Sequence, residues 1–282
     1  MTKFTVAVAQ TYCIDDMNAN YTRAEEMIAE AASKGARLIV FPEVMNYVGE
    51  PTRDSFERIP DGECIRRMSA AAKDNGIWVN IGSIREIDPD DPDGKPFNTS
   101  VMISPDGEIN AIYRKLHLSD MQTTPNNPPV LESDRINKGE RIVVADTELC
   151  KIGMSICYDL RFPEMYRLMS EKGAKIICHP SCFNSTTGAA HWEVLLRSIA
   201  ILNHCYVLAS NHCGKKPTKN KPSVWGHSMI IDPWGTVIAE AGQEREALLL
   251  AEIDLDYCDE LRGRLGCMTN RREDIYKLEE LN

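Results

Sequence analysis

The sequence contains no long hydrophobic run. None of its apolar stretches approaches the roughly 18 residues that a membrane-spanning helix needs. The first ten residues, MTKFTVAVAQ, also lack an apolar stretch followed by a small-residue cleavage site, so they do not resemble a signal peptide. We therefore expect a cytoplasmic protein without a membrane partner.

Basic residues are too few for a typical nucleic-acid-binding protein. The 282 residues include 32 Lys and Arg against 42 Asp and Glu, which gives a formal net charge of −10. Nucleic acids and anionic membranes attract basic surfaces, so we expect neither as a partner. An acidic chain can still contain a local cationic pocket, and the net charge therefore does not identify a substrate.

Motifs for cofactors and metals are missing as well. The sequence has no glycine-rich phosphate-binding loop, so we expect no nucleotide cofactor. Cys178, His179 and Cys182 could form one metal-ligating cluster, but no second pair matches it, and we expect no metal. The ten cysteines of a chain without an export signal are expected to be free thiols, most of them small buried hydrophobes.

The sequence does contain an alternation of two kinds of segment. Short β-rich segments, several of them apolar on both faces, are typical of strands covered on both sides. They span residues 3–10, 37–43, 77–84, 151–158, 175–181 and 205–211. Helix-like segments lie between them, at 20–35, 63–76, 162–173 and 189–204, and the first three end at a glycine that can close a helix.

Two hairpins interrupt this alternation. Residues 98–115 turn at Pro105-Asp106-Gly107, and residues 225–242 turn at Asp232-Pro233-Trp234-Gly235. Hairpins pair strands in antiparallel fashion, so the pattern favours an α/β layered sandwich of mixed sheets over a purely parallel sheet. We find no repeat or linker-like stretch and interpret residues 1–282 as a single domain.

Three short motifs place a reactive side chain where a strand-like segment ends. They are FPEVMN with Glu43, YRKLHL with Lys115, and SICYDLRFPE with Cys157. Loops at strand ends commonly carry the functional groups of α/β folds. Each residue also has an ordinary structural interpretation, as a helix-start carboxylate, a surface cation and a buried small hydrophobe.

In combination, the motifs resemble the nitrilase superfamily of carbon–nitrogen hydrolases, in which Glu, Lys and Cys follow in that order. The resemblance runs from VAVAQ to NRREDIY and includes WGHSMIIDPWG. CYDLRFPE followed by FNSTTGAAHWEVLLRSIAI is similar to the Nit-type branch, which includes ω-amidases and deaminated-glutathione amidases. The resemblance implies a four-layer α-β-β-α sandwich and a small non-peptide amide as substrate.

The resemblance also implies roles for individual residues. Cys157 would be the nucleophile that forms a thioester, and Glu43 the general base. A carboxylate can act in both steps of the reaction if burial raises its pKa toward the working pH. Lys115 and the backbone N–H of Tyr158 would stabilise the oxyanion, and Lys115 would also favour the Cys157 thiolate. Glu132 matches a second glutamate of the family that orients the lysine or the substrate amide.

Substrate-binding residues are expected after the nucleophile and in nearby loops. Arg161 has the fork that binds a carboxylate, although it could instead pair with Asp159 or Glu164. Tyr47 and the pair Phe183 and Asn184 lie in segments that resemble pocket-lining segments of the family. The segment 117–133 differs from the family pattern and leaves the exact acid open.

The favoured function is a cofactor-independent amidase that releases ammonia from the ω-amide of a keto or dicarboxylic acid. An N-carbamoyl amidohydrolase or a nitrilase of the same superfamily is the alternative, because the same three residues serve both reactions. A binding protein without chemistry is a third, less favoured hypothesis. Family members assemble into homodimers or larger homo-oligomers, and helices 162–173 and 189–204 are the expected contact face.

Overall fold

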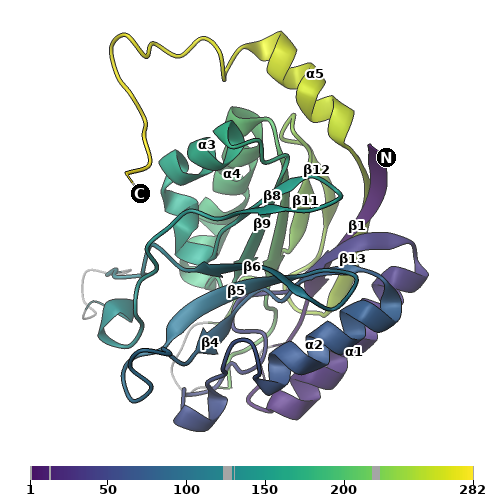
Figure 1. Cartoon of the computed structure of the whole chain (residues 1–282), viewed down its shortest axis with the longest axis vertical. Coiled ribbons are helices and arrows are strands. Elements are labelled where there is room, and N and C mark those ends of the chain that lie inside the picture. The colour runs from purple at the N-terminus through teal and green to yellow at the C-terminus, as the bar shows by residue number, and fades with distance from the viewer. Residues whose placement is uncertain (1, 13, 123–128, 130, 218–222, 282) are drawn as a thin grey trace.

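Two β-sheets lie face to face, with helices on the outer side of each (Figure 1). The computed structural model describes residues 2–12, 14–122, 129, 131–217 and 223–281. The arrangement is a four-layer α-β-β-α sandwich in a single domain, which confirms the predicted fold class. No helix in the described residues is both long and apolar enough to cross a membrane.

The first sheet is mixed and is covered by α1 (Met17–Ser33) and α2 (Glu63–Asn75). Its strands follow the order β13 (Ala247–Asp254), β1 (Lys3–Gln10), β2 (Ala36–Val40), β3 (Trp78–Asn80), β5 (Phe97–Ile103) and β4 (Ile84–Glu86), with β6 (Ile109–Arg114) also paired to β5. The antiparallel pairing of β5 with β6 confirms the first predicted hairpin.

The second sheet is also mixed and packs against α3 (Pro163–Glu171) and α4 (Ser185–Asn203). Its strands follow the order β12 (Val237–Glu240), β11 (Met229–Ile231), β10 (Tyr206–Asn211), β9 (Ile176–Ser181), β8 (Lys151–Met154) and β7 (Val144–Asp146). Strands β8, β9 and β10 are parallel, and the pairing of β11 with β12 confirms the second hairpin.

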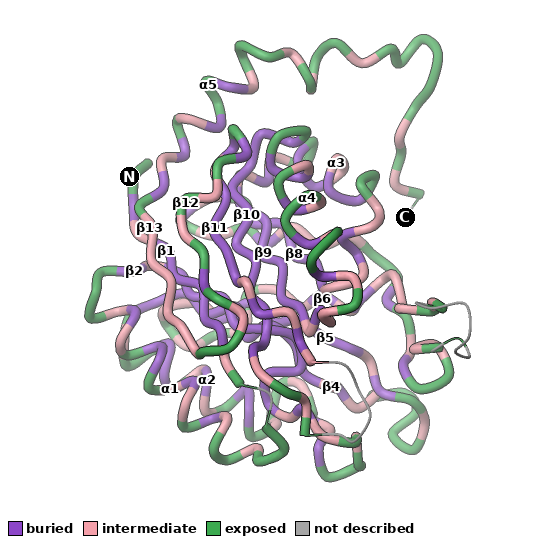
Figure 2. The backbone as a smooth tube through the Cα atoms, turned by 180° about the vertical axis from the view of Figure 1, so that it is seen from behind, coloured by how far each residue is buried: buried purple, intermediate pink, exposed green. Residues whose placement is uncertain are grey.

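Strand β1 illustrates why the central strands are apolar on both faces. Val6 and Val8 belong to the core between the two sheets, whereas Ala7 and Ala9 belong to the core under α1 and α2. Side chains alternate across a strand, so a strand between two layers buries both sets. The central strands are accordingly buried along most of their length (Figure 2).

One predicted strand is divided in the structure. Residues 77–84 were expected to form a single strand, but β3 ends at Asn80 and β4 begins at Ile84. Between them Gly82 has a φ of 67°, and a Cβ at this position would collide with the carbonyl oxygens of Phe41 and Pro42. The break therefore lets the chain pass close to the turn that contains Glu43.

The carboxyl-terminal part of the chain adds elements that the sequence analysis did not predict. Strand β13 pairs antiparallel to β1, and α5 (Leu255–Leu265) follows it. From α5 onward the chain forms an arm outside the sandwich (Figure 1). The arm returns to α3, where Glu280 accepts a hydrogen bond from Lys172, the residue that follows this helix.

Candidate active site

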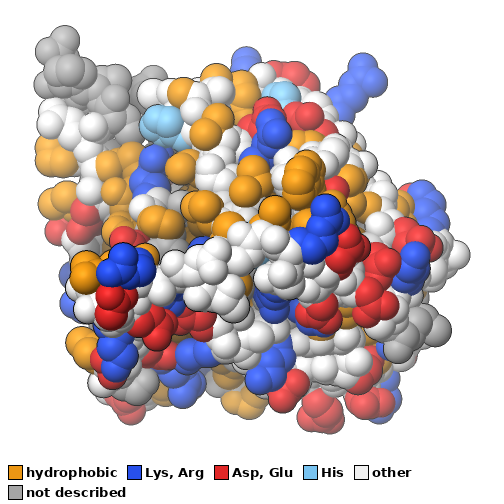
Figure 3. Space-filling model, turned by 90° about the horizontal axis from the view of Figure 1, so that it is seen from above, with side chains coloured by type: hydrophobic (Ala, Val, Ile, Leu, Met, Phe, Trp, Pro, Cys, Tyr) orange, Lys and Arg blue, Asp and Glu red, His pale blue; other side chains and the backbone are white. Residues whose placement is uncertain are grey.

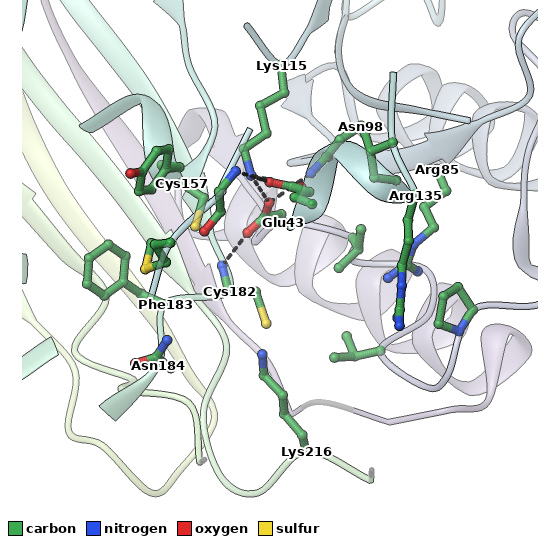
Figure 4. Close-up of a pocket in the computed structure, with 18 of the residues that line it drawn as sticks. Glu43, Arg85, Asn98, Lys115, Arg135, Cys157, Cys182, Phe183, Asn184 and Lys216 are labelled. Atoms are coloured by element: carbon green, nitrogen blue, oxygen red, sulfur yellow. Dashed lines mark hydrogen bonds and ion pairs between the residues drawn. The ribbon is translucent and has the colours of Figure 1, made fainter. Parts of the chain in front are cut away.

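Three loops bring the predicted reactive residues to one cavity of about 310 Å³. Glu43 follows β2, Lys115 directly follows β6, and Cys157 begins a short 3₁₀-helix, η3 (Cys157–Arg161), three residues after β8 ends. The first two strands belong to one sheet and β8 to the other, so the cavity lies between the two halves of the sandwich. Figure 4 shows the three side chains converging.

The Glu43 carboxylate is buried and held by several donors. Its Oε1 accepts hydrogen bonds from Asn98 Nδ2 at 2.8 Å and Lys115 Nζ at 3.0 Å, and its Oε2 accepts one from the Cys182 N–H at 2.8 Å. The Glu43 carbonyl oxygen also lies 2.8 Å from His212 Nε2. These contacts fix the carboxylate in one orientation.

Lys115 lies between two carboxylates and is only 1% exposed. Besides Glu43, its Nζ donates to both oxygens of Glu132, at 3.1 and 3.0 Å. Glu132 belongs to the 3₁₀-helix η2 (Glu132–Asp134) and also accepts a hydrogen bond from the Ser119 N–H at 2.6 Å. Glu132 is therefore in position to orient Lys115, as the resemblance implied.

Cys157 has an unusual backbone conformation. Its φ of 49° lies in the left-handed region, which costs a residue with a Cβ about 1 kcal/mol or more. The side chain lines the cavity, and backbone N–H groups in the first turn of a helix, such as that of Tyr158, have no partner within the helix. The nine described cysteines are all free thiols, and Cys13 lies outside the described residues.

The charges in the cavity set the pKa values of Glu43 and Cys157. Burial opposes ionisation of Glu43, but the Lys115 ammonium and the hydrogen bonds to the carboxylate outweigh it and lower its pKa to about 2. Burial, together with the Glu43 charge, raises the pKa of the Cys157 thiol well above its usual value, although Lys115 acts in the opposite direction. Burial therefore does not raise the pKa of Glu43 toward the working pH. Lys115 does favour the Cys157 thiolate, as expected, but its effect is smaller than that of burial.

Lys115 keeps its proton in this environment. Burial by itself disfavours the ammonium, but the Glu132 and Glu43 carboxylates more than compensate and raise the pKa of Lys115 well above its usual value. The resting cavity accordingly contains a neutral thiol, an ionised carboxylate and a protonated lysine.

Asp159 connects the turn that contains Cys157 to the loop that contains Lys115. This residue is fully buried, and its Oδ2 accepts hydrogen bonds from Tyr113 Oη at 2.6 Å and the Ile156 N–H at 2.8 Å. Its Oδ1 accepts from the His117 N–H at 3.1 Å and lies 2.8 Å from His117 Nδ1. Ile156 precedes Cys157 and His117 follows Lys115 by two positions, so one carboxylate positions both loops.

These contacts bear on the alternative interpretation of Arg161. No ion pair joins Arg161 to Asp159 or Glu164 in the part of the chain that the structure describes. Arg161 instead donates to His191 Nδ1 at 3.2 Å and lies over the rings of Tyr158 and Phe183. Arg161 lines the cavity.

The remaining predicted substrate residues divide into two groups. Tyr158, Phe183 and Asn184 line the cavity, and Asn184 also caps α4 by accepting hydrogen bonds from backbone N–H groups at 3.0 and 3.3 Å. Tyr47 does not line it; its side chain lies at a separate hollow on the surface. Its neighbours Val44 and Val48 lie at the cavity wall instead.

Several cavity residues were missed by the sequence analysis. They come from segments outside the three motifs: Arg85, Asn98, Arg135, Cys182 and Lys216. Asn98 lies in the predicted hairpin directly across from Lys115, and that pairing was the one signal that could have indicated it. No group of His, Cys, Asp or Glu side chains within the described residues is arranged to hold a metal ion.

An α-β-β-α sandwich with a buried glutamate, a buried lysine and a partly buried cysteine around one cavity is the architecture of a nitrilase-type hydrolase. The chain belongs to the carbon–nitrogen hydrolase family, whose profile matches residues 5–263. The protein is therefore an enzyme that hydrolyses carbon–nitrogen bonds, and this excludes a binding protein without chemistry.

Similar proteins match over nearly the whole chain. Omega-amidase NIT2 of Xenopus tropicalis is 39% identical over 99% of both chains, and deaminated glutathione amidase of Bos taurus is 39% identical over 96% of this chain and 83% of its own. The crystal structure of the C. elegans NitFhit protein has a TM-score of 0.90 at 34% identity, covering 99% of this chain and 67% of that one.

Proposed function

We propose that this enzyme hydrolyses small ω-amides of keto or dicarboxylic acids to a carboxylate and ammonia. The similar proteins whose names denote ω-amidases support this substrate class. The observation that carries the proposal is the charge of the cavity. Besides Lys115, which is neutralised by Glu43 and Glu132, four cationic residues line it: Arg85, Arg135, Arg161 and Lys216.

A cationic cavity in a chain of net charge −10 is suited to an anionic substrate. An ω-amide of a dicarboxylic acid combines the scissile amide with a carboxylate a few atoms away. The cavity volume of about 310 Å³ suits such a small molecule. We assign the substrate carboxylate to Arg161, because this residue follows the nucleophile by four positions and its fork can bind both oxygens.

In the acylation step, the Cys157 Sγ attacks the amide carbon while Glu43 accepts the thiol proton. The ionised state of Glu43 and the neutral state of Cys157 are the states that this proton transfer requires. The negative charge that develops on the carbonyl oxygen is stabilised by the Lys115 ammonium and the Tyr158 N–H. Glu43 then donates the proton to the nitrogen, the carbon–nitrogen bond breaks, and ammonia leaves.

In the deacylation step, Glu43 accepts a proton from a water molecule that attacks the thioester carbon. The carbon–sulfur bond breaks, the proton returns to the Cys157 sulfur, and the carboxylic acid is released. Lys115 stabilises the second tetrahedral oxyanion as it did the first. Glu132 acts through Lys115, because it holds the ammonium and balances part of its charge.

Ammonia release from a panel of compounds tests this function. We expect succinamic acid and other ω-amides with a free carboxylate to be hydrolysed, and Cys157→Ala to abolish turnover while the protein stays folded. Full activity in that variant would refute the role of Cys157. Faster hydrolysis of N-carbamoyl amino acids or nitriles than of any ω-amide would favour the alternative reaction of the same family.

We further propose that copies of the chain assemble into a homo-oligomer through α3 and α4. Val194, Ile201 and Leu202 of α4 are 63%, 40% and 47% exposed, and hydrophobic side chains gather among charged ones on the face seen in Figure 3. Burial of such side chains favours association. Light scattering should give a dimer or larger form that Val194→Asp weakens, and a monomeric wild-type protein would refute the proposal.

We also propose that the enzyme acts in the cytoplasm, where its free thiols would stay reduced. Fluorescence of a tagged full-length chain should be diffuse in the cytoplasm, and retention in a membrane or secretory fraction would refute this location.

A further inference from the structure

The peptide group that links Glu43 to Val44 is held at both of its polar ends. His212 Nε2 lies 2.8 Å from the Glu43 carbonyl oxygen, and the Val44 N–H donates to Ser83 Oγ at 2.8 Å. Both His212 and Ser83 are buried. Within the part of the chain that the structure describes, the Glu43 carbonyl oxygen has no other hydrogen-bond donor. His212 therefore holds one end of this peptide group, and Ser83 holds the other.

This peptide group leads into a strained residue. The φ of Val44 is 49°, in the left-handed region, where a β-branched residue is an outlier. Such a conformation persists only where the surrounding contacts enforce it. Rotation of the peptide group changes φ of Val44 and ψ of Glu43 together, so a rotation that relieves Val44 also reorients Glu43. The direction of the Glu43 side chain therefore depends on the two contacts that hold the peptide group.

His212 is itself fixed by Thr11, the residue that follows β1. A carbonyl oxygen can only accept a hydrogen bond, so the Nε2 that faces Glu43 must carry a proton. In the neutral ring Nδ1 is then an acceptor, and the Thr11 hydroxyl, 3.1 Å away, donates to it. The Thr11 carbonyl oxygen already accepts from the Cys213 N–H at 2.9 Å. The Thr11 hydroxyl therefore selects the tautomer of His212 that can hold Glu43.

We propose that His212 is a positioning residue for the general base of this enzyme. Thr11 sets its tautomer, and its Nε2–H holds the peptide group after Glu43, so that the carboxylate stays against Lys115 and can exchange protons with Cys157. Neither Thr11 nor His212 lines the catalytic cavity, so both act through Glu43 rather than on the substrate. This role concerns the proton transfers of Glu43, and it therefore rests on the proposed amidase mechanism.

Two replacements of His212 that differ in one donor group test this role. Leu at position 212 has no donor, whereas Gln has a side-chain N–H that can reach the Glu43 carbonyl oxygen. We expect His212→Leu to lower kcat for succinamic acid by about tenfold to a hundredfold, as for a general base that is displaced by about 1 Å. KM should change little, because His212 does not touch the substrate. His212→Gln should restore most of the lost kcat.

The pH profile provides a readout that a purely structural role of His212 would not move. The Lys115 ammonium and the hydrogen bonds to the carboxylate lower the pKa of Glu43 to about 2. A displaced carboxylate loses part of these contacts, so its pKa should rise in His212→Leu. The pH below which kcat/KM falls should therefore be higher in His212→Leu than in the wild type or in His212→Gln.

Thr11→Val is a milder second variant that serves if His212→Leu does not fold. It keeps the β-branched shape and removes only the hydroxyl, so that the ring of His212 can place its proton on Nδ1 instead of Nε2. We expect kcat to fall in Thr11→Val by less than in His212→Leu, with KM nearly unchanged. A folded Thr11→Val variant with wild-type kcat would contradict the selection of the tautomer.

Alkylation of Cys157 by iodoacetamide tests the same role without any amide substrate. The thiolate is the reactive form, and Glu43 is the group that accepts the thiol proton. The rate of Cys157 labelling, followed by mass spectrometry of its peptide, should fall by about tenfold in His212→Leu. Cys267 is exposed and provides an internal reference whose labelling rate should not change.

His204→Leu is the matched control. His204 is also a buried histidine, but its ring nitrogens have no hydrogen-bond partner among the described residues, and it does not line the cavity. This variant should keep the wild-type kcat and the wild-type rate of Cys157 labelling.

The outcomes separate the role of His212 from the substrate class. A folded His212→Leu variant with wild-type kcat and a wild-type labelling rate overturns the role, and so do equal losses in His212→Leu and His212→Gln. If the wild type hydrolyses no ω-amide but Cys157 labelling still depends on His212, the proposed substrate class fails and the role of His212 stands.

Discussion

Replacement of the buried Asp159 by Asn should impair both stability and turnover. The carboxylate accepts four hydrogen bonds, two at each oxygen, from Tyr113, Ile156 and His117. The amide of Asn keeps one oxygen and replaces the other with a donor NH₂ group. Because each oxygen accepts one backbone N–H, the substitution leaves either the Ile156 or the His117 N–H facing a donor.

The magnitude follows from these contacts. A buried N–H without an acceptor costs about 1 to 3 kcal/mol, and the loss of a charge-assisted bond adds to that cost. We therefore expect Asp159→Asn to lower the free energy of unfolding by about 2 to 4 kcal/mol. Ile156 directly precedes Cys157, so the loss of its hydrogen bond should displace the nucleophile. A displacement of less than 1 Å should lower kcat by about tenfold to a hundredfold.

Urea unfolding followed by circular dichroism measures the first effect, and steady-state hydrolysis of succinamic acid measures the second. Since Asp159 acts by positioning, kcat should fall while KM changes little. Asp274→Asn is the matched control, because this carboxylate is exposed and forms an ion pair with nearby Arg272. An Asp159→Asn variant with wild-type stability and kcat would refute the positioning argument.

Three further predictions concern the backbone and the titration of buried groups. Cys157→Gly should be more stable than Cys157→Ala by about 1 kcal/mol in urea unfolding, because glycine adopts a φ of 49° without strain. Equal stability of the two variants would contradict backbone strain at this residue. Because the pKa of Glu43 is lowered to about 2, protonation of Glu43 should not reduce kcat/KM above about pH 4. Asn98→Leu removes a hydrogen-bond donor to Glu43, so it should raise the pH below which kcat/KM falls. Burial lowers the pKa of His179 from 6.5 to about 4. The buried neutral form therefore contributes stability above about pH 6.5. This contribution is progressively lost as the pH falls toward 4, by up to about 3 kcal/mol. The urea midpoint should therefore fall as the pH is lowered through this range, and His179→Gln should make it depend less on pH.

The sandwich itself was largely predictable from local patterns. Segments such as 3–10 and 175–181 are apolar on both faces, and only a strand covered on two sides has that pattern. Strand β13 was missed because most of its residues are only partly buried and it lies at the edge of its sheet. The division between β3 and β4 was missed because the close approach of Gly82 to Pro42 is a contact between distant segments.

The sequence by itself determined the three reactive residues, because each motif ends a strand-like segment and the motifs follow in the order of a known family. Only the tertiary structure decided their charge states. The pKa of Glu43 depends on Lys115, which is distant in the chain but only 3.0 Å away in space, and no local pattern contains that distance. Arg85 and Arg135 reach the cavity for the same reason, since folding alone brings β4 and the segment after η2 together beside Glu43.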